Sequence, residues 1–201
     1  MRLSLQTNFP VVDRMLGRLS DEVASKALPS ATNKTMAQAS TMMRREITRE
    51  FNVKGDYVRD RLRVKRAVYR RGVFAVEAEL IGGDGKRRSA NLIRFLERQT
   101  TLAQARSRAK KGTLDQLHFQ IRKAGGKQIV RGAFIGNKGR TVFIREGKAR
   151  TPIKPVRTID VSQMFNAKRI NTKVLEFIRA KFPQVFESEV RHFTRRFNDG
   201  R

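Results

Sequence analysis

The chain has 201 residues and carries 45 lysine and arginine side chains against 18 aspartate and glutamate side chains, a formal net charge of +27 at pH 7. This length suits one domain with a substantial core, and a charge so far above what solubility requires indicates an acidic partner. The lack of cysteine excludes a disulfide framework and thiolate chemistry. No stretch approaches the roughly 20 apolar residues that span a bilayer, and no export signal is recognisable, so we expect a cytoplasmic protein without membrane contact.

Two amphipathic helices are predicted in the N-terminal part, residues 1–63. The first starts near Pro10 and pauses around Pro29, and its apolar residues recur at spacings of three and four: Val12, Leu16, Leu19, Val23 and Ala27. The second has the same rhythm at Met36, Ala39, Met43, Ile47 and Phe51. A shorter helix is predicted over residues 55–62.

The middle part, residues 64–157, is predicted to form a sheet with basic loops. Its first strand alternates between apolar and acidic residues: Phe74, Val76, Ala78 and Leu80 on one face, Glu77 and Glu79 on the other. The glycine-rich residues 82–86 predict a turn, and residues 91–96 a return strand, so that the two strands form a hairpin. We expect Glu77 and Glu79 to pair with nearby arginines, because a charged outward face is the ordinary use of such a pattern.

A polar and basic segment follows over residues 98–112, and it has little apolar surface to bury. We therefore expect a loop that a partner orders. Its contact candidates are Arg106, Arg108, Lys110 and Lys111. The next strand is predicted where Leu117, Phe119 and Ile121 alternate with polar residues.

Two further strands are predicted over residues 129–135 and 141–145, joined by a hairpin turn at residues 136–139. A basic loop follows, stiffened by Pro152 and Pro155. Its candidates for contact with a partner or with DNA phosphates are Arg145, Lys148, Arg150, Lys154 and Arg157. Only Asp115 and Glu146 are acidic between Arg98 and Arg157, so this region is the electrostatic centre of the chain.

The C-terminal part, residues 158–201, is predicted to be one long helix that Pro183 kinks or splits. Its apolar residues keep three- and four-residue spacing: Leu175, Ile178, Phe182, Phe186, Val190, Phe193 and Phe197. A helix this long can extend beyond its own domain, so Val190, Phe193 and Phe197 are candidates for a subunit interface. The whole chain, residues 1–201, is thus predicted to be a single α+β domain, with an antiparallel sheet of about five strands flanked by N-terminal helices and a long C-terminal helix.

Three motifs in the C-terminal half resemble the phage and prophage minor tail protein Z family. They are a GAFI strand at Gly132-Ala133-Phe134-Ile135, then V-x-x-R-x-G-x-x-R-x-P-I from Val142 to Ile153, then V-x-x-M-F at Val161, Met164 and Phe165. The basic second helix, running into Val53, Val58, Arg59, Leu62, Val64, Arg66 and Ala67, is also similar to the family. The chain departs from the pattern at Thr158-Ile159-Asp160, where Gly-Pro-Ser is expected, and at Gln163, where proline is commoner.

The resemblance implies a structural protein of a tailed phage, without catalysis, cofactor or metal. It implies action at the head-proximal end of the tail, in tail completion and head-tail joining. It also implies other tail and neck proteins as partners, a place in the virion, and the host cytoplasm during assembly. As a mechanism, we expect copies to dock in a homo-oligomeric ring while the basic loops engage acidic neighbours or the phosphates of exiting DNA, without sequence preference.

Two other functional classes account for parts of the sequence. A non-sequence-specific nucleic-acid-binding protein, associated with the nucleoid or the ribosome, would explain the charge but not the GAFI and P-I motifs. A basic nuclease subunit would need clustered carboxylates for a metal ion, and the acidic residues are scattered. His118 and His192 lie in no metal-ligand spacing, and no Ser-His-Asp or Cys-His arrangement is recognisable, so we predict no enzymatic activity.

Overall fold

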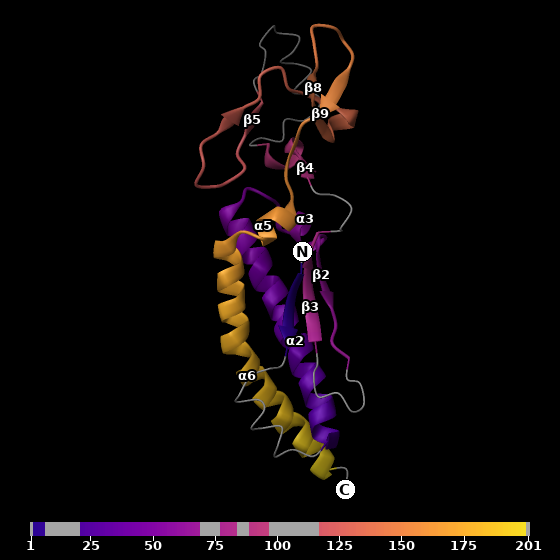
Figure 1. The fold of residues 1–201 in the computed structure, drawn as a ribbon, viewed down its shortest axis with the longest axis vertical. Coiled ribbons are helices and arrows are strands. Elements are labelled where there is room, and N and C mark those ends of the chain that lie inside the picture. Colours follow the sequence, from indigo (N-terminus) through magenta and orange to yellow (C-terminus); the bar gives the residue numbers. More distant parts are fainter. Residues whose placement is uncertain (1, 7–20, 69–76, 84–88, 97–116, 200–201) are drawn as a thin grey trace.

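The computed structural model describes residues 2–6, 21–68, 77–83, 89–96 and 117–199 (Figure 1). These residues form an elongated body in which two long helices and a three-stranded sheet lie at one end and several small sheets at the other. We call residues 2–6, 21–68, 77–83 and 161–199 the stem, and residues 89–96 and 117–159 the β tip. The α+β class is confirmed, with an N-terminal helix, antiparallel strand pairing and a long C-terminal helix.

The first long helix, α2 (Asp21–Glu50), is continuous through Pro29, so the predicted pause there is wrong. Proline removes only the one helical bond that its N–H would donate to Ser25. The apolar stripe, in contrast, runs on both sides of it: Ala27, Ala31, Met36, Met43 and Ile47 are all fully buried. Packing along this stripe therefore outweighs the lost bond. Residues 7–20, where the first predicted helix begins, lie outside the described residues.

The second long helix, α6 (Lys168–Asp199), also continues through a proline, Pro183, so it is not split. It lies antiparallel to α2, because Arg169 near its start pairs with Glu50 near the end of α2, and Lys34 pairs with Glu189 at the opposite ends. Phe182 and Phe186 are fully buried, with ring centroids 6.2 Å apart. Ile178, Phe182, Phe186 and Val190 of the predicted stripe thus pack within the stem. Leu175 is exposed, so its place in the predicted stripe is wrong, and Val174 is buried instead.

The stem sheet has the order β1-β3-β2, formed by β1 (Arg2–Gln6), β2 (Leu62–Lys65) and β3 (Glu77–Gly82), and it covers the side of α2 that faces away from α6 (Figure 1). Ala78 and Leu80 of β3 are fully buried, as the alternation predicts, and Glu79 lies 3.9 Å from Arg2 and 3.8 Å from Lys65. The predicted hairpin partner is wrong. Both edges of β3 are occupied by β1 and β2, and residues 92–95 of the predicted return strand form a 3-10 helix.

A short helix, α3 (Gly55–Arg59), confirms the third predicted helix and leads into β2. Next to α3, at the same end of the stem, α5 (Val161–Phe165) precedes α6 and begins with a capping box (Figure 1). The Asp160 carboxylate accepts from the Val161 N–H at 2.7 Å, and the Gln163 side chain accepts from the Asp160 N–H at 2.9 Å. Asp160 and Gln163 are positions where the sequence departs from the pattern noted above, and together they begin this helix.

The β tip contains short antiparallel sheets in place of the single sheet of about five strands that the sequence predicted. β4 (Ser89–Asn91) pairs with β10 (Arg157–Ile159), β5 (His118–Phe119) pairs with β6 (Gln128–Ile129), and β8 (Thr141–Arg145) lies between β7 (Phe134–Gly136) and β9 (Ile153–Pro155). Single-turn 3-10 helices, η1 (Leu92–Phe95) and η2 (Asn137–Gly139), complete it.

The predicted strand over residues 129–135 is divided into β6 and β7. Gly132 has a φ of 74°, in the left-handed region, and the Ala133 N–H donates to the Val130 carbonyl at 3.1 Å, so a turn interrupts the strand. The predicted hairpin turn at residues 136–139 is confirmed between β7 and β8, with Asn137, Lys138 and Gly139 all at positive φ. The predicted basic loop, in contrast, contains the strand β9.

Candidate functional site

The five predicted contact residues Arg145, Lys148, Arg150, Lys154 and Arg157 are all exposed and follow the β8–β9 hairpin into β10; we call them the basic arm. Strand pairing places Arg145 opposite Ile153, and the Glu146 N–H donates to the Pro152 carbonyl at 3.1 Å, which closes the base of the hairpin. The arm is therefore mounted on a hydrogen-bonded ladder at the end of the molecule far from the stem (Figure 1).

Two cations of the basic arm have partners within the tip. The Arg145 guanidinium carbon lies 4.7 Å from the ring centroid of Phe134, and Lys154 Nζ lies 3.2 Å from Glu146 Oε1. Exposed pairs of this kind contribute little to stability. Lys148, Arg150 and Arg157 form no ion pair within the described part of the chain. A role for these three side chains in contact with a partner stays a prediction.

The second predicted set, Arg106, Arg108, Lys110 and Lys111, lies outside the described residues. The residues of the predicted subunit interface lie within the described part of the chain. Val190 is buried in the core of the stem, Phe193 is half-buried and packs against that core, and Phe197 is half-buried. A role for these three side chains in subunit contact stays a prediction.

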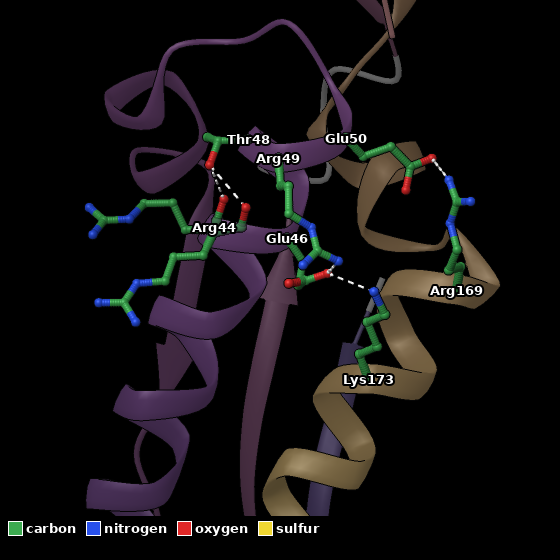
Figure 2. Close-up of polar contacts among 8 residues, drawn as sticks. Arg44, Glu46, Thr48, Arg49, Glu50, Arg169 and Lys173 are labelled. Atoms are coloured by element: carbon green, nitrogen blue, oxygen red, sulfur yellow. Dashed lines mark hydrogen bonds and ion pairs between the residues drawn. The ribbon is translucent and has the colours of Figure 1, made fainter. Parts of the chain in front are cut away.

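A second basic feature lies where the stem meets the β tip, and the sequence did not single it out. Five cations line a cleft of about 770 Å³ between the end of α2, the start of α6 and the β5–β6 turn, and we call it the basic cleft: Arg49, Arg122, Lys123, Arg169 and Lys173. Figure 2 shows its stem side, with Arg49 on α2 and both Arg169 and Lys173 on α6 reaching toward glutamates of α2.

Two glutamates hold these cations in place. Glu46 Oε2 accepts from Arg49 Nη2 at 2.6 Å and from Lys173 Nζ at 3.3 Å, and its side chain is 8% exposed. Glu50 Oε1 lies 2.8 Å from Arg169 Nη2 (Figure 2). The spacing of Arg169 and Lys173, one helical turn apart, was a usable signal for a shared face. The contacts of these two cations with Glu46 and Glu50 could not be predicted from the sequence, because they depend on how α2 and α6 pack against each other.

A polar cluster around the buried Asp160 also joins the stem to the tip. The Tyr57 hydroxyl donates to Asp160 Oδ1 at 2.9 Å, and Arg61 Nε lies 3.4 Å from the same oxygen without forming a hydrogen bond. The guanidinium carbons of Arg61 and Arg94 lie 3.7 Å and 4.9 Å from the Tyr57 ring centroid. Burial and the hydrogen bond to Asp160 raise the pKa of Tyr57 to about 12. Tyr57 is thus a neutral donor that fixes Asp160 at the start of α5.

The described residues hold no constellation with evident reaction chemistry. No three His, Asp or Glu side chains among them gather closely enough to hold a metal ion. His118 is exposed on β5, and the exposed His192 packs its ring edge-on against Phe193, with centroids 5.1 Å apart. None of the described helices is long and apolar enough to cross a membrane. The arrangement is suited to binding anionic groups on two separate surfaces.

Comparison with known proteins gives one match. The family model described as Prophage minor tail protein Z (GPZ) matches residues 12–199, which include the stem helices and the whole β tip. No curated protein and no solved structure matches the chain. The matched residues include the basic arm and the basic cleft.

Proposed function

Because this chain belongs to the prophage minor tail protein Z family, we propose that it completes the tail of a phage at the head-proximal end and takes part in joining the tail to the head. A structural role in a phage tail, in contact with other tail proteins of the virion, follows from the family itself. The match over nearly the whole chain is the observation that carries the proposal. We assign the protein no reaction.

Several copies would assemble as a ring around the tail axis. A closed ring repeats each contact, so contacts that are weak singly become strong together. The continuous helices α2 and α6 support this arrangement, because they give each copy a stiff body that can present its β tip in a fixed direction. The stem would dock against neighbouring copies, with Phe193 and Phe197 as contact candidates.

The basic arm would engage acidic surfaces of neighbouring proteins or the backbone of exiting DNA. Its support is the exposure of Lys148, Arg150 and Arg157 without an ion pair in the described residues, on a chain with a net charge of +27. So many like charges repel one another, and an acidic neighbour relieves that repulsion. The arm lacks a groove-reading helix, so DNA contact would be with phosphates and independent of sequence.

A general nucleic-acid-binding protein is the second candidate, favoured by the net charge alone. It would bind duplex DNA without any tail partner, and log K would fall by about 0.9 per contacted phosphate for each decade of salt. A tail protein, in contrast, should be found in purified particles. Cryo-electron microscopy of particles therefore separates the two functions: a ring of this chain where tail meets head supports the tail function, and its absence from particles favours nucleic-acid binding.

Charge reversal tests the basic arm. We expect the Lys148→Glu/Arg150→Glu prophage to assemble few completed particles, because the arm would repel its acidic partner. Neither side chain pairs within the described residues, so the chain should still fold. The matched control is Arg179→Glu/Arg195→Glu on the exposed face of α6, which changes the net charge equally. Normal particle yield from the arm variant, or equal failure of both variants, would contradict the proposed role of the arm.

A further inference from the structure

We propose that the basic cleft binds an acidic, extended segment of another protein. This site is separate from the basic arm, shares no residue with it, and does not depend on where in the particle the protein lies. The proposal rests on the number of cations in the cleft, on the way they are held, and on the size and lining of the space between them.

Charge comes first. The described lining contains five cations and two carboxylates, so the cleft keeps a positive excess after every glutamate is paired. Glu46 and Glu50 are largely buried, with side chains 8% and 15% exposed, whereas the cations are exposed: the side chains of Arg49, Arg169 and Lys173 are 63%, 69% and 41% accessible. The negative groups therefore lie at the floor and the positive groups at the opening.

The floor also positions the cations. Arg49 and Arg169 each use one Nη atom to contact a glutamate, which leaves their other N–H groups available to a ligand. Guanidinium groups held in this way lose little freedom when they bind a carboxylate, and a two-point contact with a carboxylate is their preferred geometry. Glu46 and Glu50 thus act as positioning residues for the opening of the cleft.

The opposite wall is a turn whose main chain is fixed by hydrogen bonds, and the guanidinium carbon of its Arg122 lies 5.7 Å from the Phe51 ring centroid. The Lys123 N–H donates to the Glu50 carbonyl at 2.9 Å, and the Asn52 N–H donates to the Ile121 carbonyl at 2.9 Å, so the turn is bound to the end of α2. The Gln120 side chain donates to the carbonyls of Lys123 and Gly125, both at 3.0 Å. Arg122 and Lys123 themselves are exposed and form no ion pair within the described residues.

The space and its lining favour a peptide over nucleic acid. About 770 Å³ lies in the usual range of small-ligand pockets and has room for a few residues. A DNA duplex is too thick to enter a space of this volume, so it would reach only the cations at the opening. Single-stranded nucleic acid is bound by stacking its bases on aromatic rings, and none of the described residues that line the cleft is aromatic. A second copy is disfavoured too, because the acidic residues of this chain are few and scattered and form no long acidic run that could fill the cleft.

The test measures binding to the purified full chain. The probes are a fluorescently labelled peptide of about ten alternating Asp and Glu residues and a dT oligonucleotide of the same charge, each followed by anisotropy. We expect Arg122→Gln/Lys123→Gln to weaken peptide binding by about tenfold, because two charge-assisted contacts are lost. The matched control Arg179→Gln/Arg195→Gln removes the same charge from the outer face of α6, and we expect less than about a threefold loss.

Two results would overturn the proposal. Equal weakening by the cleft and control variants would show that only net charge matters. Tighter binding of dT than of the peptide, lost in the cleft variant, would assign the cleft to nucleic acid. Arg122 and Lys123 are exposed, so the double variant should fold, and an unchanged far-ultraviolet circular dichroism spectrum checks this. If the double variant unfolds, the single Lys123→Gln variant replaces it. We expect that variant to weaken peptide binding by about threefold. This test does not measure particle yield, so the peptide-binding proposal can be refuted without any consequence for the proposed tail function.

Discussion

The stem and the β tip are stabilised in different ways. In the stem, two helices bury a long apolar stripe that includes Phe182, Phe186, Met36 and Met43, all fully buried. In the tip, every residue of β6 and β9 is exposed. The stem therefore carries most of the hydrophobic stabilisation, and the tip carries the basic arm. A surface rich in unpaired charge cannot also be a core, so the two tasks lie at opposite ends of the molecule.

Polar side chains hold the tip where apolar contacts are few. Asn91 Oδ1 accepts from the N–H groups of Ile93 at 3.1 Å and Val142 at 2.9 Å, and its Nδ2 donates to the Val142 carbonyl at 3.2 Å. One side chain thus links β4, η1 and β8. Elements held in this way open locally at lower free energy than a packed helix pair.

The largest expected effect is in the stem. Phe182→Ala should lower the free energy of unfolding by about 3–5 kcal/mol, since it removes a fully buried ring and leaves a cavity. Phe134→Ala in the tip should cost about 1–2 kcal/mol, because that ring is only half-buried and stacks on Phe143. Urea unfolding of both variants gives the comparison. Equal losses would show that stability is not concentrated in the stem.

The next effect should be confined to the tip. Asn91→Ala leaves the N–H and carbonyl of Val142 without their side-chain partner, at a cost of about 2 kcal/mol. Hydrogen exchange should become faster in β4 and β8 while α2 and α6 keep their protection. The control is Asn137→Gly in η2, because glycine tolerates the positive φ of this position and the exposed side chain has only a weak contact with Thr141 at 3.4 Å. Faster exchange throughout the stem would contradict the separation of the two regions.

The contrast between the stem and the β tip also explains which elements could be predicted from the sequence. A 3.6-residue period reports burial along a helix, so the apolar stripes of both long helices were recognisable, although the sequence prediction wrongly divided α2 at Pro29. The turn at residues 136–139 and the strand β8 were also predictable, because glycine and asparagine at positive φ mark a tight turn. These features are local.

Strand pairing and the basic cleft could not be predicted. Strands of two or three residues give no register, and β1 was not foreseen although it occupies an edge of β3. Likewise, Arg169 and Glu50 lie far apart in the sequence and meet only because α2 and α6 are antiparallel. The basic arm was recognisable because its five cations lie within 13 residues of sequence, and charge density needs no tertiary information.

The buried carboxylate of Glu189 in the stem should make the free energy of unfolding depend on pH. Burial opposes the ionisation of Glu189, but hydrogen bonds from Lys34 and Ser30, both at 2.6 Å, outweigh it and lower its pKa. A lowered carboxyl pKa adds stability above the unfolded value of 4.5, and that stability is lost as pH falls through the folded value. Wild type should thus exceed Glu189→Gln by about 1 kcal/mol at pH 7.

Urea unfolding of both proteins between pH 7 and pH 3 measures this difference. The gap should close as the pH falls, because protonated glutamate and glutamine are both neutral. The tip offers a control in Glu146→Gln, whose carboxylate is exposed and pairs with Lys154 at 3.2 Å, and this variant should match wild type throughout. A gap for Glu189→Gln that stays constant down to pH 3 would mean that its pKa is not lowered by folding.

The smallest effect on stability should come from the basic arm. Lys148→Gln/Arg150→Gln should change the free energy of unfolding by no more than about 0.5 kcal/mol, because both side chains are exposed and neither has an ion pair in the described residues. Relief of repulsion could even stabilise the chain slightly, which low-salt and high-salt unfolding would reveal. If these substitutions cost as much as Asn91→Ala, the arm holds the tip together. If they cost nothing while particle assembly fails, the charges are kept for a partner, and the division between a stable stem and a binding tip is real.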